Sequence, residues 1–133
     1  MKTIFILIFL FCALQVLGQF KDGSYDIIQS SCGATFGNLK IHNNTDKDFK
    51  YSIEVKNASA GQTGEVEGSA IHYVNKNTAY STLVYTDELD TIYSYLYFDI
   101  SPNEEYIHVH GERTFIYHGA SICFDGYYEY NKD

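Results

Sequence analysis

The sequence predicts an all-β fold, and three observations support this prediction. Short runs in which apolar and polar residues alternate recur about every ten residues, as in half-buried strands. No stretch after residue 19 shows a helical period. Aromatic residues make up 17% of the chain and there is one proline, so the composition is that of a folded protein. We therefore expect a single small antiparallel β-barrel of about eight strands, with a β-sandwich as the alternative.

The first 18 residues have the pattern of a cleaved signal peptide. An apolar run from Ile4 to Leu14 follows Lys2, and Val16 and Gly18 provide the residues expected before a cleavage site. The run is shorter than the roughly 20 apolar residues of a membrane span. We expect residues 1–18 to be removed, residues 19–133 to form one domain, and this domain to be secreted or periplasmic.

The strands are predicted in order along the chain from alternation between turn signals. Phe49, Tyr51, Ile53 and Val55, for example, alternate with charged or polar residues and indicate a strand with one buried face. Clusters of Asn, Asp, Gly and Pro separate the runs. The predicted strands are 25–29, 37–42, 49–55, 65–74, 78–85, 91–100, 106–110, 115–117 and 121–130.

The last hairpins can be given a register. If Ile100 lies opposite Glu105, then Phe98 faces Ile107 and Leu96 faces Val109, which forms a coherent apolar face. The same reasoning sets Val109 opposite Phe115 and Ile107 opposite Tyr117. The other face of these three strands then includes Tyr93, Tyr95, Tyr97, Asp99, Tyr106, His108, His110 and His118.

Two of the three cysteines belong to the expected mature domain. Cys12 lies in the signal segment, which leaves Cys32 and Cys123 as a pair in an oxidising compartment. We expect a disulfide that ties the first strands to the last. The alternative is that one of the two is a reactive thiol nucleophile.

Aromatic and histidine side chains cluster on one predicted face. Strand propensity explains any single tyrosine, but such density on one face favours contact with a ligand or partner. On the outside of a barrel these residues would meet a partner, and on the inside they would line a cavity for a small molecule. The predicted binding residues are Tyr93, Tyr95, Tyr97, Asp99, Tyr106, His108 and His110.

Metal binding is the weakest of the candidate chemistries. His108 and His110 lie on one side of a strand about 6 to 7 Å apart, and His118 is the candidate for a third nitrogen. Two exposed histidines two residues apart are common on a plain solvated strand, and this interpretation is favoured over a metal site, so no cofactor is predicted.

The acidic charge of the domain and the lack of known catalytic motifs argue against two classes of function. After loss of Lys2 the domain has eight basic and 17 acidic residues, which argues against nucleic acid as a partner. No nucleophile elbow, zinc-protease motif or phosphate-binding glycine loop is present, so we expect a non-enzymatic protein.

Two segments, residues 61–70 and 123–128, carry a family likeness. They resemble glycine-rich patterns of small exported bacterial β-barrel proteins, which are similar in build to periplasmic lysozyme inhibitors. We expect a binding protein whose acidic surface docks a basic protein, and the resemblance implies that this partner is a lysozyme-type enzyme, which the binding would inhibit. The alternative is a lipocalin-like carrier that holds a small molecule in an aromatic cavity.

Overall fold

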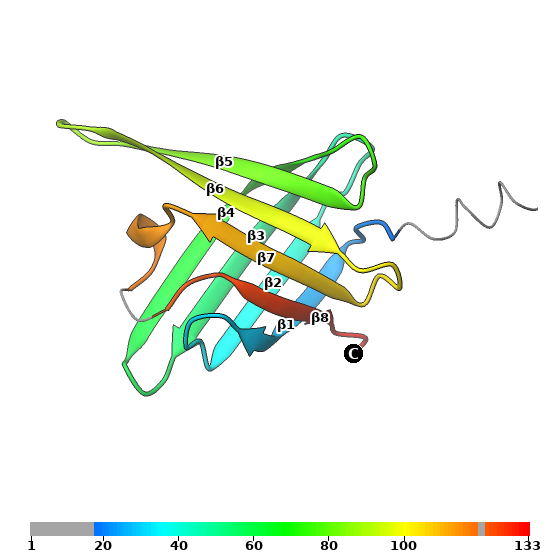
Figure 1. Ribbon diagram of the computed structural model, residues 1–133, viewed down its shortest axis with the longest axis horizontal. Helices are drawn as coiled ribbons and strands as arrows, with labels where there is room; N and C mark the ends of the chain where they lie inside the picture. The colour runs from blue at the N-terminus through cyan, green and yellow to red at the C-terminus, as the bar shows by residue number, and fades with distance from the viewer. Residues whose placement is uncertain (1–17, 120–121) are drawn as a thin grey trace, which may run out of the picture.

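Eight antiparallel strands, each paired with the next, form a barrel that closes where β8 pairs with β1 (Figure 1). The computed structural model describes residues 18–119 and 122–133. It confirms the predicted all-β barrel and excludes the sandwich. The strands are β1 (Gly23–Ser30), β2 (Phe36–His42), β3 (Asp48–Asn57), β4 (Gln62–His72), β5 (Thr78–Thr86), β6 (Thr91–Ile100), β7 (Tyr106–Glu112) and β8 (Gly126–Tyr130).

Alternation along each strand decides which side chains enter the barrel. Successive side chains point to opposite faces of a strand, so every second residue of a half-buried strand is apolar. In β3 this places Phe49, Tyr51, Ile53 and Val55 inside, all at most 2% exposed. Other large buried side chains include Tyr25, Leu39, Leu96, Phe98, Ile107, Val109, Phe124 and Tyr128.

Three buried tyrosines donate hydrogen bonds through their hydroxyl groups to acceptors within the fold. The Tyr51 hydroxyl donates to the Ser81 Oγ at 2.7 Å, and the Tyr25 and Tyr128 hydroxyls donate to main-chain carbonyls. Burial raises the pKa of Tyr51 to about 12, and it raises the pKa values of Tyr25 and Tyr128 further above the ordinary value. The phenols therefore fill the interior in their neutral form.

The predicted disulfide is confirmed. Cys32 follows β1 and Cys123 precedes β8, and the bond joins them with a Cα–Cα distance of 5.8 Å. It lies beside the closing pair of strands. At this point Gly126 passes so close to β1 that an added Cβ would collide with the carbonyl oxygen of Gln29. A glycine is thus required where the sheet closes.

The structure corrects two expectations about the last hairpins. Ile100 lies opposite Ile107 rather than Glu105, a shift of two residues that keeps the same side chains inside. Residues 115–117 form a 3₁₀ turn, not a strand, and β7 pairs with β8 instead. The predicted last strand also began too early, because β8 starts at Gly126. Most of the predicted signal peptide lies outside the described residues.

The barrel is least complete between β4 and β5. Their register consists of two pairs, Ile71 with Tyr80 and His72 with Ala79, whereas β5 pairs with β6 along its whole length. The β5–β6 hairpin therefore diverges from β4 and extends beyond the rest of the barrel (Figure 1). We call the unpaired part of the β4 edge, residues 65–69, together with the Leu83 and Tyr117 side chains that lie beside it, the β4–β5 opening. None of the described helices is long and apolar enough to span a membrane.

Removal of the disulfide tests how much closure of the chain stabilises the fold. The bond joins residues 91 positions apart, and a loop of that length is worth roughly 4 to 5 kcal/mol in the chain-entropy model. We expect the Cys32→Ala/Cys123→Ala variant to lose about 2 to 5 kcal/mol of unfolding free energy in urea titrations. Reduced wild-type protein is the control and should match the variant; an unchanged midpoint would contradict the prediction.

Alkaline pH should destabilise the barrel through its buried tyrosines. Above pH 10 an unfolded tyrosine loses its proton while folded Tyr51 keeps it until about pH 12. The stabilising contribution is complete below pH 10 and falls by up to about 1.4 kcal/mol per pH unit as the pH rises toward 12. Urea titrations at pH 9 and pH 11 measure this effect. Between these two pH values the Tyr51→Phe variant should lose less unfolding free energy than the wild-type protein. Equal losses would count against this assignment.

Candidate functional site

The seven predicted binding residues all lie on the outside of the barrel, on β6 and β7. They alternate with inward side chains such as Leu96, Phe98 and Val109, which are fully buried. We call this outer surface the aromatic face. It consists of Tyr93, Tyr95, Tyr97, Asp99, Tyr106, His108 and His110.

Strand pairing brings the aromatic and histidine rings of the face together. Tyr97 lies opposite His110, and their rings stack with centroids 6.2 Å apart. Asp99 lies opposite His108, so a carboxylate is placed beside the second imidazole. Partial burial, followed by the charge of Glu112, raises the pKa of Tyr97, so its hydroxyl stays neutral. The face presents flat aromatic and imidazole rings, with the carboxylate of Asp99 among them.

The neighbouring strands add residues that sequence reasoning missed. Tyr127 of β8 lies opposite His108, and the two rings stack at 4.6 Å. Tyr80 of β5 lies opposite Tyr97 and packs against Tyr73 at 5.1 Å. Tyr127 was missed because the predicted partner of β7 was residues 115–117. Tyr80 was missed because the inward residues of β5 include the small Ala79 and Ser81, which weaken the alternation signal.

Asp125 connects the face to the turn before β8. Its Oδ2 lies 3.1 Å from the His110 Nδ1, and its Oδ1 accepts the Gly111 amide at 3.0 Å. One carboxylate therefore fixes both the imidazole and the main chain of β7. This role could not be predicted from the sequence, because Asp125 and His110 belong to separate segments of the chain.

His118, the third candidate metal ligand, lies away from His108 and His110. His118 follows the 3₁₀ turn, where its Nε2 lies 2.9 Å from the Thr114 Oγ1 and its ring meets Phe124 edge-on. The expectation that it shares the face of His108 and His110 is wrong, because residues 115–117 are not a strand. Within the described residues no three His, Cys, Asp or Glu side chains gather as a metal site.

Charge is distributed unevenly between the two halves of the barrel. Residues 77–131, which include β5 to β8, have nine carboxylates and one arginine, whereas residues 19–76 have seven carboxylates and six lysines. Three of the nine, Asp87, Glu88 and Asp90, lie in the turn of the protruding hairpin together with Leu89, which is 96% exposed. The aromatic face therefore belongs to the acidic half of the molecule.

The barrel interior contrasts with this surface. Its described inward side chains form one apolar cluster, and most are less than 7% exposed.

A shallow hollow of about 600 Å³ lies outside the barrel, between Tyr73 and Tyr97, and reaches Asp99. A second hollow, of about 560 Å³, lies across β2 to β4 and reaches Leu83 and Tyr117.

Comparison of the chain with models of known protein families, with curated proteins and with solved structures finds no match. The geometry and charge of the described residues therefore carry the functional assignment.

Asp125 offers a direct test of how the aromatic face is organised. Asp125→Ala removes the acceptor of the Gly111 amide, so we expect a loss of about 1 to 2 kcal/mol in unfolding free energy. Asp125→Asn keeps an oxygen acceptor and should lose less than about 1 kcal/mol. Urea titration measures both, and equal effects of the two substitutions would show that the hydrogen bond is unimportant.

Proposed function

We propose that this protein is an exported, non-enzymatic binding protein that docks a basic protein through its aromatic face. One observation carries the proposal: four tyrosines and two histidines gather on the outside of β6 and β7, in the half of the chain (residues 77–131) that has nine carboxylates and one arginine. An acidic surface rich in tyrosine is complementary to a cationic protein surface.

The physical properties of the face suit protein recognition. Tyrosine provides a large apolar ring with a polar tip and loses little conformational entropy on binding. Stacking of Tyr97 with His110 and of Tyr127 with His108 holds rings in place before a partner arrives. The surrounding carboxylates attract a basic partner over several ångströms and raise the association rate at low salt.

The alternatives receive less support from the described residues. A lipocalin-like carrier needs an internal cavity, but Leu96, Phe98, Ile107 and Val109 fill the interior without exposed surface. Metal binding needs a third ligand beside His108 and His110, and His118 lies away from them. A lysozyme-type enzyme fits the proposal as a partner because it is basic, and the resemblance of residues 61–70 points to the same class.

Binding to a basic lysozyme tests the proposal. Biolayer interferometry with immobilised lysozyme should show binding at 20 mM salt and an association rate about tenfold lower at 200 mM salt. Tyr95→Ser and Tyr97→Ser should each weaken binding by about tenfold or more, as expected for central aromatic contacts.

Phe36→Ser is the matched control, because Phe36 is an exposed aromatic residue of β2, outside the face. It should leave the dissociation constant unchanged. Cytochrome c, a basic protein of another class, tests whether binding is specific for lysozyme. Binding to lysozyme alone supports a lysozyme-type enzyme as the partner. Binding to both proteins supports recognition of basic proteins in general. If neither binds at 20 mM salt, the proposal is wrong.

A further inference from the structure

Part of the β5-side edge of β4, at residues 65–69, pairs with no other strand among the described residues. The pairing of β4 with β3 is unbroken from Ile71 to Gln62, but its pairing with β5 ends after Ile71. At the other end of β4, Gly64 bridges to His118. Between these contacts, at residues 65–69, the pairing of the described residues includes no partner on the β5 side.

The hydrogen bonds around this edge show which main-chain groups face the β4–β5 opening. The Thr63 carbonyl accepts the Gly119 amide, and the Tyr73 amide donates to the Thr78 carbonyl, both on the β5 side. Main-chain groups alternate in direction along a strand, so the odd-numbered residues between them face the same way. Glu67 and Ser69 therefore direct their amides and carbonyls into the opening.

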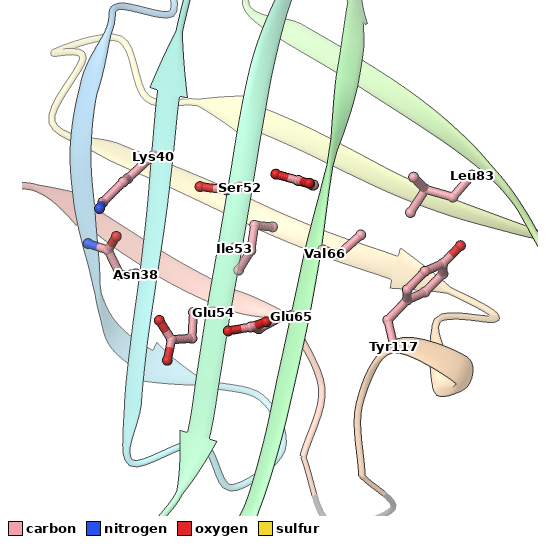
Figure 2. Close-up of a pocket in the computed structure, with 10 residues that line it drawn as sticks. Asn38, Lys40, Ser52, Ile53, Glu54, Glu65, Val66, Leu83 and Tyr117 are labelled. Atoms are coloured by element: carbon pink, nitrogen blue, oxygen red, sulfur yellow. The ribbon is translucent and has the colours of Figure 1, made fainter.

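Side chains give the opening two different linings. Leu83 and Tyr117 lie just beyond the edge of β4, where Val66 also reaches the hollow of about 560 Å³ (Figure 2). On the outer surface the same hollow is bordered by Glu54, Glu65 and Glu67, with Lys40 at its far side. The lining is thus apolar toward the barrel interior, and toward solvent it has three carboxylates, one lysine and the neutral polar Asn38 and Ser52.

We propose that the β4–β5 opening binds an extended peptide segment in which basic and apolar residues alternate, and that the peptide adds as an antiparallel strand to β4. Its main chain would pair with Glu67 and Ser69, as in strand addition to an exposed sheet edge. The protein would thereby have a second binding site.

Register determines the side-chain pattern of the peptide. Residues directly opposite one another in neighbouring strands point to the same face. Peptide residues opposite Glu65 and Glu67 therefore lie outside, where lysine or arginine meets the carboxylates. The residue opposite Val66 points inward, toward Leu83 and Tyr117, and is apolar.

A second copy of this chain is a poor occupant of the same edge. Two β4 strands pairing symmetrically about Val66 would place Glu65 of each copy opposite Glu67 of the other. Like charges in opposite positions destabilise a strand pair. Charge complementarity therefore favours a basic segment from another protein.

The site is independent of the proposed function. No residue of the aromatic face borders the hollow at β4. Loss of binding at one surface should leave binding at the other intact, so the two proposals can fail separately.

Amide hydrogen exchange followed by NMR tests the site directly, with the peptide Ac-Lys-Val-Lys-Val-Lys-NH₂ as probe. In the free protein the Glu67 and Ser69 amides should exchange fast, while the Gly68 and Ala70 amides, which face β3, exchange slowly. Added peptide should slow exchange at Glu67 and Ser69 at least tenfold. A peptide of the same composition with the order Lys-Lys-Val-Val-Lys should bind more weakly, because its side chains cannot satisfy both linings.

Variants of the full domain distinguish the effect of the carboxylates at the β4 edge on peptide binding from the effect of the overall negative charge. Glu65→Gln/Glu67→Gln should weaken peptide binding about fivefold, whereas Glu88→Gln/Asp90→Asn, which removes two charges from the β5–β6 turn, should not. Slow exchange of the Glu67 and Ser69 amides in the free protein would overturn the proposal. The proposal would also be overturned if the peptide slowed amide exchange only at the aromatic face. It would likewise be overturned if native mass spectrometry showed a dimer of this chain in which the Glu67 and Ser69 amides are protected.

Discussion

Closure of the sheet between β1 and β8 is the constraint on which the rest of the structure depends. Without it β1 and β8 would be free edges and the sheet would have no defined inside. Closure requires Gly126 at the point of close approach, and the disulfide between Cys32 and Cys123 lies beside the same pair of strands. Once the sheet is closed, alternation along every strand assigns each side chain either to the core or to the surface.

The small interior of an eight-stranded barrel has a direct functional consequence. Such an interior is just wide enough for side chains to fill. Here Phe49, Tyr51, Phe98 and Tyr128 occupy it, and the tyrosine hydroxyls reach acceptors within the fold. The proposed recognition surface therefore lies on the outside of the barrel, where four tyrosines and two histidines of the aromatic face belong to β6 and β7.

Unequal pairing on the two sides of β5 gives the molecule its second surface. β5 follows β6 over nine residue pairs but meets β4 over two, so the hairpin diverges, and residues 65–69 of β4 have no strand partner on that side among the described residues. Exposed edges promote aggregation, and charged side chains such as Glu65 and Glu67 oppose self-pairing. The same charges that protect the edge give it a preference for a basic strand.

The sequence by itself determined the all-β class, the approximate ranges of most strands, the cysteine pair and the grouping of the seven predicted binding residues on one face of the sheet, but not whether that face is inside or outside. Each depends on local alternation or on composition, which a single chain displays directly. Only the tertiary structure decided the register of β6 with β7, the place of His118, the contribution of Asp125 and Tyr127, and the β4–β5 opening. A two-residue shift leaves every side chain on the same face, so alternation cannot detect it. Which distant segments meet depends on closure of the barrel, and that is a property of all eight strands together.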